Sequence, residues 1–376
     1  MQARARQSGL LALVSDLLLL ASALHAYALT EGPYTYTVTD NEATITGFDT
    51  SYSPELSITN ELGGYPVTSI GYAAFRACKS LTSVTIPASV TSIGNYAFYV
   101  CPALASVTIP GTVTSIDKYA FSYCPALTSV TIPDSVTSIS NSAFGSCISL
   151  TAINVSPANP EFASIDGVLF DKDLTNLIQC PGGFSGHYTM PDNVTSIGDD
   201  AFFSCTSLTS VAIPRSVTAI GIGAFGSCTS LTSVAISDSV TSIVNRAFYN
   251  CPSLTSVLFT GSAPNIDFFD FHSSPATIYY LPAFASNWPG TYGERPTLCW
   301  NPQVRRDAGF GFDSNGFGFD IAGTTNIPVV VEACTNLTSG VWTRLTNATL
   351  GTAGSIRFND PASTNLPTRY YRIVWP

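Results

Sequence analysis

The chain has 376 residues, of which 45% are hydrophobic and only 11% charged, with a formal net charge of −10. This length allows two ordinary domains or one long repeat array, and the hydrophobic content excludes a globally disordered chain. The excess of acids, with no basic stripe, argues against nucleic-acid binding. Because charged residues make up about 25% of an average soluble protein, this surface must consist largely of Ser, Thr, Asn and Gly.

The first 28 residues have the pattern of a cleavable export signal. Arg4 and Arg6 precede the apolar run Leu10–Leu20, and Ala26-Tyr27-Ala28 is a small-x-small cleavage site. Asp16 interrupts the run, and a short membrane anchor or a buried helix is the alternative. Because the run is short for a membrane span, we expect a secreted or cell-surface protein with no membrane span after signal removal.

Residues 67–262 contain seven copies of one unit, V-T-S-I-x-x-x-A-F-x-x-C-x-x-L-T-S-V-x-I. Successive copies start 23 residues apart, except for one interval of 58 residues. A period near 23 lies in the range of leucine-rich repeats. The copies start at Val67, Val90, Val113, Val136, Val194, Val217 and Val240.

Each unit combines two short strands with one tight turn. Val84 and Ile86 alternate with Ser83 and Thr85, which is typical of a half-buried strand, and residues 67–70 form a second extended piece. The A-F-x-x-C segment predicts a helical or 3₁₀ turn with its Ala, Phe and Cys inward. Because one unit cannot bury its apolar side, the units must stack at the strand spacing of about 4.8 Å to form a continuous core.

Two residue types recur at fixed positions of the unit. The Phe residues should form an aromatic spine, and a Phe→Ala substitution there should cost about 3–5 kcal/mol. Seven equivalent thiols cannot all pair, so we expect the repeat cysteines to be small buried hydrophobes; no His or carboxylate cluster shares their position to favour a metal. Outside the repeat positions, Cys299 and Cys334 are a candidate bridge. The repeated residues are Phe75, Phe98, Phe121, Phe144, Phe202, Phe225 and Phe248, with Cys78, Cys101, Cys124, Cys147, Cys205, Cys228 and Cys251.

The repeated unit resembles the BspA-like (Treponema pallidum-type) leucine-rich repeat over about residues 67–262. The sequences YTVTDNEATITGF and LGGYPVTSI, which lead into the first copy, are similar to the lead-in strands of such arrays. We interpret residues 29–66, which hold six acids and no base, as an N-terminal cap. The resemblance implies export or surface exposure, and adhesion in some members. Ligands vary within the family, so the fold does not define one.

Residues 154–193 interrupt the period, and we interpret them as one enlarged coil of the array. Within it, residues 162–170 alternate like a hairpin around Asp166-Gly167, and a further strand is expected at 177–181. The coil is also a candidate contact site.

After Gly261 the repeat pattern weakens, and we interpret residues 263–302 as the cap that hides the last edge of the core. Residues 303–376 carry no repeat, and Asn315-Gly316 is a strong hairpin signal. The whole chain is therefore expected to be mainly β, with a leucine-rich-repeat solenoid followed by a small β-sandwich-like module. Its strands are expected near 276–280, 310–312, 317–321, 329–333, 341–345, 355–358 and 370–374.

Candidate catalytic groups are few. The sequence Gly183-Phe184-Ser185-Gly186-His187 fails the G-x-S-x-G pattern at its last position, and we interpret it as a Gly-rich turn. Asp166, Asp171 and Asp173 could serve glycoside hydrolysis or Ca²⁺ binding, but a regular solenoid offers no cleft, so we interpret them as solvated turn acids. Residues 313–316 copy part of a calcium loop without its Glu. We expect no enzyme, no metal and no cofactor.

The outer surface of the array is the candidate binding region. The hydroxyl residues that alternate with the inward residues form a strand face, which becomes more apolar towards Ser256 and Leu258. Binding hot spots usually contain Trp, Tyr or Arg, which this face lacks. The face is therefore either a docking surface or a scaffold without a binding role. Its candidate residues are Ser83, Thr85, Ser106, Thr108, Ser129 and Thr131. The variable turn positions supply aromatic rings and cations, at Tyr72, Arg76, Tyr96, Tyr99, Lys118, Tyr123, Arg246 and Tyr249.

Three functions fit these patterns. The first is an exported, non-catalytic binding or adhesion protein that presents the array to a protein or a surface glycan. The second is a carbohydrate-binding or polysaccharide-processing accessory protein acting through its C-terminal module, with Trp342 and Trp375 stacked on sugar rings. The third is a structural spacer, in which array length matters and surface identity does not.

Overall fold

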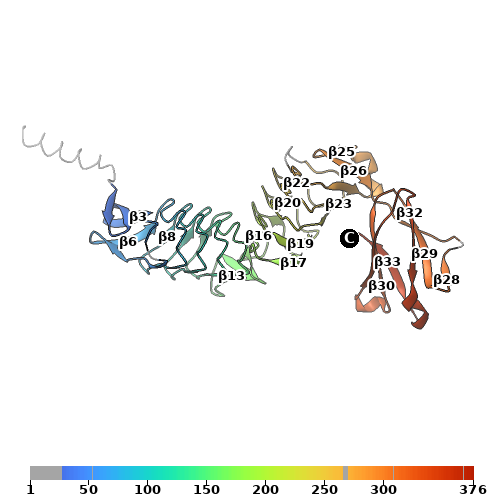
Figure 1. The fold of residues 1–376 in the computed structure, drawn as a ribbon, viewed down its shortest axis with the longest axis horizontal. Helices are drawn as coiled ribbons and strands as arrows, with labels where there is room; N and C mark the ends of the chain where they lie inside the picture. Colours follow the sequence, from blue (N-terminus) through green and yellow to red (C-terminus); the bar gives the residue numbers. More distant parts are fainter. Residues whose placement is uncertain (1–27, 53, 266–269, 308, 367) are drawn as a thin grey trace, which may run out of the picture. The chain divides into compact units, whose positions relative to one another are not determined.

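The computed structural model describes residues 28–52, 54–265, 270–307, 309–366 and 368–376. The expected signal peptide lies outside the described residues, apart from Ala28. The chain divides into two compact units, residues 1–162 and 163–376. Both are built mainly of short β-strands, as Figure 1 shows.

Unit 1 begins with antiparallel strands and continues as a parallel solenoid (Figure 1). Consecutive repeats lie side by side in register: Ile70 is opposite Ile93, and Val84 is opposite Val107. This register confirms that equivalent positions of the repeat stack on each other. The strands are β1 (Leu29–Glu31), β2 (Tyr34–Thr39), β3 (Glu42–Phe48), β4 (Glu55–Ser57), β5 (Glu61–Leu62), β6 (Tyr65–Ile70), β7 (Ser83–Thr85), β8 (Ser92–Ile93), β9 (Ser106–Thr108), β10 (Ser115–Ile116), β11 (Ser129–Ile132), β12 (Ser138–Ile139) and β13 (Ala152–Val155).

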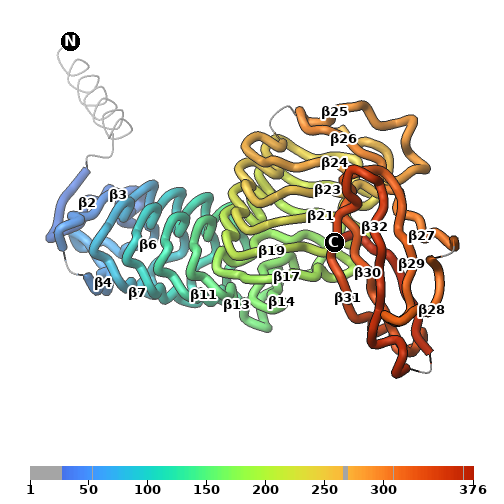
Figure 2. The backbone as a smooth tube through the Cα atoms, turned by 45° about the vertical axis from the view of Figure 1, so that its right-hand side comes forward, coloured from blue at the N-terminus to red at the C-terminus, as the bar shows by residue number. Residues whose placement is uncertain are grey.

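Unit 2 contains further coils of the same kind, which Figure 2 shows stacked one on another from green to yellow. Its coils supply two rows of parallel strands, β16-β18-β20-β22 and β17-β19-β21-β23-β24. The elements are β14 (Phe162–Ile165), β15 (Val168–Asp171), β16 (Asn176–Gln179), β17 (Ser185–Thr189), β18 (Ser196–Ile197), β19 (Ser207–Ala212), β20 (Ala219–Ile220), β21 (Ser233–Ile236), β22 (Ser242–Ile243), β23 (Ser256–Phe259), β24 (Thr277–Tyr280), the 3₁₀ helix η1 (Pro282–Asn287), β25 (Thr291–Tyr292) and β26 (Arg295–Cys299).

The aromatic spine is confirmed. In unit 1, successive rings from Phe75 to Phe144 stack with centroids 4.9–5.6 Å apart, and all are buried. In unit 2, the rings from Phe202 to Phe248 stack at 4.9–5.2 Å. The spacing matches the distance between neighbouring strands, because each coil contributes one ring at the same position.

The spine continues one coil beyond the recognisable motif. Phe271 stacks on Phe248 at 5.3 Å with an interplanar angle of 1°. Ser274 occupies the cysteine position: its Oγ donates to the Phe248 carbonyl at 2.6 Å and accepts from the Cys251 amide at 2.9 Å. Part of the segment expected to be cap is therefore another coil.

The repeat cysteines are buried, as expected, but they are more than small hydrophobes. The Sγ of Cys228 donates to the carbonyl of Phe202 in the preceding coil at 3.0 Å, and Cys251 donates to Phe225 in the same way at 3.0 Å. Burial raises the pKa of the Cys251 thiol to about 11, which keeps the donor protonated. All ten cysteines are free, so the candidate bridge between Cys299 and Cys334 is not formed.

The turn between the two strands of a coil is tighter than a regular helix. Two residues per coil take a left-handed backbone, for example Tyr96 and Val100, both with φ of 59°. Hydrogen bonds between coils hold this geometry, such as the Phe75 amide donating to the Ala97 carbonyl at 2.7 Å. The 3₁₀ geometry that we expected in the coils occurs instead in η1, at the end of the array.

The enlarged coil contains the expected hairpin. Asp166 and Gly167, with φ of 51° and 78°, connect β14 to β15, and β16 then pairs antiparallel with β15 and parallel with β18. The Asp171 carboxylate accepts from the Thr175 amide at 2.7 Å and from the Asn176 amide at 2.9 Å, which closes the next turn.

Aromatic side chains close the C-terminal end of the solenoid core. The Trp288 ring lies 5.0 Å from Phe259, and its Nε1 donates to the Gly261 carbonyl at 3.0 Å. The Tyr292 hydroxyl donates to the Pro264 carbonyl at 2.6 Å. The end of the core is thereby covered with its polar groups bonded, as a terminal cap requires.

The C-terminal module consists of two antiparallel sheets, in agreement with a sandwich-like fold. In one sheet β29 pairs with β27, β28 and β32, and in the other β30 lies between β31 and β33. Phe319 and Phe358 of the first sheet share a core with Val329 and Val331 of the second. The elements are β27 (Gln303–Arg305), β28 (Gly311–Asp313), β29 (Gly316–Ala322), β30 (Pro328–Cys334), η2 (Leu337–Ser339), β31 (Thr343–Thr349), β32 (Ser355–Asp360), η3 (Pro361–Asn365) and β33 (Tyr370–Val374).

Within unit 2, the module covers the strand face of the last coils. Leu258 and Tyr279 point out of the solenoid, yet they are only 4% and 5% exposed because they join the core of the module. The Trp300 Nε1 donates to the Pro328 carbonyl at 2.7 Å across the same contact. This packing explains why the strand face becomes apolar towards its C-terminal end.

Candidate recognition surface

The expected strand face of unit 1 is present but chemically plain. Five of its six predicted hydroxyl residues are exposed, and Ser83 is half-buried. They surround the inward Val84, Val107 and Val130 on β7, β9 and β11. The face therefore offers hydroxyls without an aromatic or charged anchor.

The variable turn positions of unit 1 converge into one tyrosine cluster, defined here as Tyr72, Tyr96, Tyr99, Tyr119 and Tyr123. The ring of Tyr96 is central: its centroid lies 5.6 Å from Tyr72, 5.2 Å from Tyr99 and 5.1 Å from Tyr119. Tyr99 also lies 5.3 Å from Tyr123. Three successive coils thus contribute to a continuous aromatic surface.

The backbone of the repeat explains this convergence. The inter-coil bonds align equivalent positions, for example through the Tyr96 amide, which donates to the Lys118 carbonyl at 3.1 Å. Tyr119 follows Tyr96 by one period of 23 residues, so it extends the same column. Our sequence analysis missed Tyr119, although this spacing was a usable signal.

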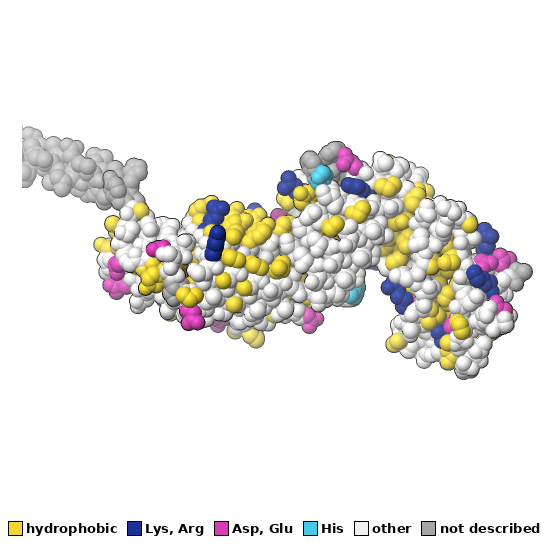
Figure 3. Space-filling model, viewed as in Figure 1, with side chains coloured by type: hydrophobic (Ala, Val, Ile, Leu, Met, Phe, Trp, Pro, Cys, Tyr) yellow, Lys and Arg dark blue, Asp and Glu magenta, His cyan; other side chains and the backbone are white. Residues whose placement is uncertain are grey.

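Two cations flank the tyrosine cluster. The Arg76 guanidinium lies 5.7 Å from the centre of the Tyr99 ring, and the Lys118 ammonium lies 5.0 Å from that of Tyr119. Burial among its neighbours raises the pKa of Tyr99, so the phenol remains protonated at neutral pH. Figure 3 shows Lys and Arg side chains beside hydrophobic ones on the visible face of unit 1.

The tyrosine cluster is only partly buried. Tyr72 is 67% exposed and Tyr123 43% exposed, while the three rings between them are half-buried. Exposed rings held by their neighbours lose little conformational freedom on binding, which favours them as contact residues.

The two remaining predicted residues lie in unit 2. The Arg246 guanidinium is 5.9 Å from the centre of the Tyr249 ring, and Tyr249 stacks on His272 at 5.7 Å. His272 was missed by our sequence analysis, although it follows Tyr249 by one period. This group repeats the aromatic–cation pairing of the tyrosine cluster on a smaller scale.

The candidate catalytic residues do not assemble a site among the described residues. Gly183 lies in the expected turn, which the Phe184 amide closes by donating to the Pro181 carbonyl at 2.9 Å. Ser185 and His187 instead lie on β17, and His187 Nδ1 is 2.8 Å from Ser210 Oγ. The Asp313–Gly316 segment forms the expected hairpin turn, with the Asn315 amide bonded to the Asp313 carboxylate at 2.6 Å. In the described ranges, no group of three or more His, Cys, Asp or Glu could hold a metal ion.

Both tryptophans proposed for sugar stacking contact other side chains of the module or the solenoid. The Arg372 guanidinium lies 4.3 Å from the centre of the Trp342 ring. Trp375 is half-buried and contacts Tyr279 and Trp300, with centroids 4.9 and 5.9 Å away. Trp375 is therefore not the open stacking platform that we expected, and Trp342 is half-buried with Arg372 over its ring.

These features define a leucine-rich-repeat β-solenoid protein. The family described as BspA type leucine rich repeat region matches residues 53–175 and 186–287 in six copies. Because the match covers more than half of the chain, the chain belongs to this family. None of the helices in the described ranges has the length and apolarity that a membrane crossing requires.

The chain is also similar to solved structures of bacterial leucine-rich-repeat proteins. A leucine-rich repeat protein from Eubacterium ventriosum is 25% identical with a TM-score of 0.53, over 68% of this chain and 78% of that one. A leucine rich cell surface protein from Faecalibacterium prausnitzii is 26% identical with a TM-score of 0.45, over 67% and 94% of the two chains. The T. pallidum leucine rich repeat protein is 24% identical with a TM-score of 0.37, over 60% and 90%. No curated protein matches the chain.

Proposed function

We propose that this chain is a secreted or cell-surface, non-catalytic binding protein whose tyrosine cluster recognises a protein partner. The observation that carries the proposal is the contact of five tyrosines from three coils, flanked by Arg76 and Lys118. Tyr and Arg are enriched among the residues that dominate protein–protein binding energy. The export signal expected in residues 1–28 supports the location, and membership of a leucine-rich-repeat family supports the absence of catalysis.

A variant that keeps the fold is available from the chain itself. Ser142 occupies the repeat position of Tyr96 and Tyr119, with φ of 60°, and Ser146 occupies that of Tyr123. The triple substitution Tyr96→Ser, Tyr119→Ser and Tyr123→Ser should therefore preserve the backbone while removing three of the five rings, including the central Tyr96.

The test is a binding screen of residues 29–376 against a panel of host and bacterial surface proteins and polysaccharides. We expect a protein partner whose affinity falls about tenfold or more in the triple variant. A matched control, Thr85→Ala with Thr108→Ala on the strand face, should bind as the parent does. A partner that binds the triple variant unchanged would refute the role of the cluster, and the absence of any partner would favour the spacer function.

A further inference from the structure

The C-terminal module has a cavity between its two sheets, lined by residues of β27 and β29 in one sheet and of β33 in the other. Its volume is about 540 Å³, within the range of small-ligand sites. Phe317, Phe319 and Tyr371 line it, and Phe310 lies at its edge with 40% of its surface exposed. Tyr371 stacks on Phe317 at 5.3 Å and 14°, so aromatic rings fill the space between the sheets.

Among the described residues, one cation that lines the cavity has no counterion. Of its three arginines, Arg369 pairs with Asp360 at 2.5 Å and Arg372 with Glu332 at 2.7 Å. Arg306 makes no ion pair in the part of the chain that the structure describes, and its guanidinium lies 5.7 Å from the centre of the Phe310 ring.

Asp307, the acid that follows Arg306 in the sequence, forms no ion pair with it among the described residues. The carboxylate of Asp307 accepts from the Gly309 amide at 3.1 Å and so belongs to the turn that follows β27. The described residues that line the cavity include three arginines and no acid. An anionic ligand that enters this cavity would therefore contact the exposed Arg306 guanidinium beside the Phe310 ring.

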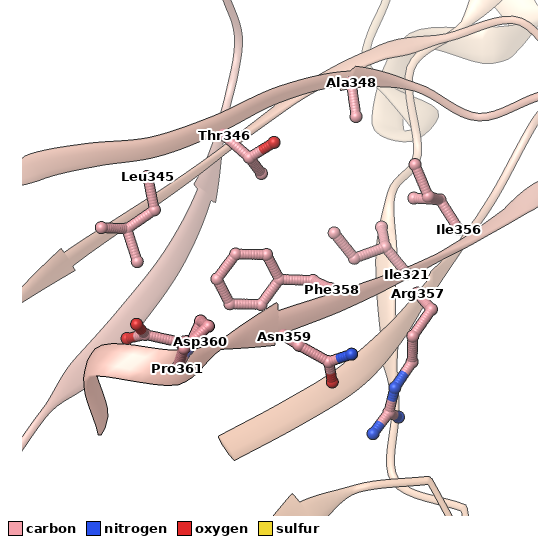
Figure 4. Close-up of a pocket in the computed structure, with 10 residues that line it drawn as sticks. All are labelled: Ile321, Leu345, Thr346, Ala348, Ile356, Arg357, Phe358, Asn359, Asp360 and Pro361. Carbon is pink, nitrogen blue, oxygen red and sulfur yellow. The ribbon is translucent and has the colours of Figure 1, made fainter. Parts of the chain in front are cut away.

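The opposite opening of the sandwich lacks this combination. That cavity, between β31 and β32, has a volume of about 340 Å³ and an apolar wall that includes Leu345 and Phe358. Figure 4 shows its arginine, Arg357, directed away from Phe358. Arg357 is paired with Asp313 at 3.4 Å and Asp320 at 3.6 Å. The unpaired cation thus distinguishes the first cavity.

We propose that the cavity between β27 and β33 binds an acidic sugar residue of a uronic-acid polysaccharide. The sugar carboxylate pairs with Arg306, in the charge-assisted geometry that guanidinium groups favour. The apolar face of the pyranose ring packs on Phe310 at the cavity edge. An added peptide strand fits less well, because its inward side chains would need the space that Phe317 and Tyr371 already fill. This site is independent of the tyrosine cluster, which lies in the other unit.

Adjacent residues provide matched controls for a test on residues 29–376. Arg306→Gln removes the unpaired cation, and Arg305→Gln removes an exposed neighbour that does not line the cavity. Phe310→Ala removes the stacking ring, and Phe312→Ala removes a ring that is 70% exposed outside the cavity. The probes are polygalacturonate, alginate and hyaluronate, with neutral galactan, dextran sulfate and polyglutamate as comparisons, all followed by calorimetry.

We expect at least one uronic-acid polymer to bind, with affinity lowered about tenfold or more by Arg306→Gln and by Phe310→Ala. The control variants Arg305→Gln and Phe312→Ala should bind the same polymer as tightly as the parent does. The neutral polymer, galactan, should not bind. Four results would overturn the proposal: no binding of any uronic-acid polymer, equal weakening by Arg305→Gln and Arg306→Gln, tighter binding of dextran sulfate with the same residue dependence, or tighter binding of polyglutamate. Unchanged circular dichroism of each variant shows that folding is intact.

Discussion

Replacing Cys228 distinguishes a hydrogen-bonding role of the repeat cysteines from a purely hydrophobic one. Its Sγ donates to the Phe202 carbonyl at 3.0 Å, and that carbonyl also accepts from the Cys205 amide at 3.1 Å. Cys228→Ala removes the thiol donor but leaves the amide bond, so the lost hydrogen bond should cost about 1 kcal/mol. The cavity left by the sulfur adds about 1 kcal/mol.

Cys228→Ser should cost less than Cys228→Ala, by about 1 kcal/mol, because a hydroxyl can replace the thiol as donor. The chain contains a precedent, since Ser274 donates to the Phe248 carbonyl at 2.6 Å from the same repeat position. If the site were only hydrophobic, the order would reverse, because a buried hydroxyl without a partner costs about 1–3 kcal/mol.

Urea unfolding followed by tryptophan fluorescence measures this difference. All four tryptophans, Trp288, Trp300, Trp342 and Trp375, lie in unit 2 together with Cys228. Ser274→Ala serves as the reciprocal control and should destabilise unit 2 by removing the same kind of bond. A Cys228→Ala variant that is as stable as Cys228→Ser, or more stable, would refute the reasoning.

Three further outcomes follow from the same structure. Phe225→Ala should lower the free energy of unfolding by about 3–5 kcal/mol, measured by urea unfolding; a loss below 1 kcal/mol would contradict a packed spine. Val100 is a β-branched residue with φ of 59°, so the Val100→Asn substitution should raise the free energy of unfolding by about 1 kcal/mol, while Asn250→Val at the equivalent repeat position should lower it by a similar amount. Circular dichroism during thermal unfolding measures both effects, and the opposite signs would disprove the strain argument. Stability should also fall at alkaline pH: burial raises the pKa of Cys251 from 9.0 to about 11, so the stabilisation is complete below pH 9 and is lost as the pH rises to 11. Urea midpoints at stepwise pH test this, and a midpoint that stays constant up to pH 11 would contradict it.

The repeat made much of the array predictable from the sequence. Each unit has the same alternation, and parallel pairing in register places equivalent residues of successive coils in contact. The positions of Phe75 and Phe98 in a stacked spine therefore followed from a period of 23 residues. The same argument extends to Tyr96 and Tyr119, whose rings lie 5.1 Å apart.

The sequence predictions were incomplete where the residues of the repeat motif are replaced by others but the 23-residue period is kept. Phe271 and Ser274 continue the spine and the cysteine column although the usual Ala-Phe and Cys are absent. His272 pairs with Tyr249 for the same reason. Spacing was a better guide than residue identity here, because the backbone ladder fixes the position and several side chains can satisfy it.

The sequence by itself determined the coil, its inward residues and the candidates for the tyrosine cluster, since all of these depend on contacts one period apart. Only the tertiary structure decided which surfaces are covered and which charges remain unpaired. Leu258 is buried by residues of the module that are about 60 positions later in the chain, such as Phe319. Arg306 lies beside Phe310 without a counterion among the described residues, while Arg369 and Arg372 are paired with acids on other strands. Such contacts follow no period, because they depend on how separate sheets pack together, and local sequence patterns do not encode that packing.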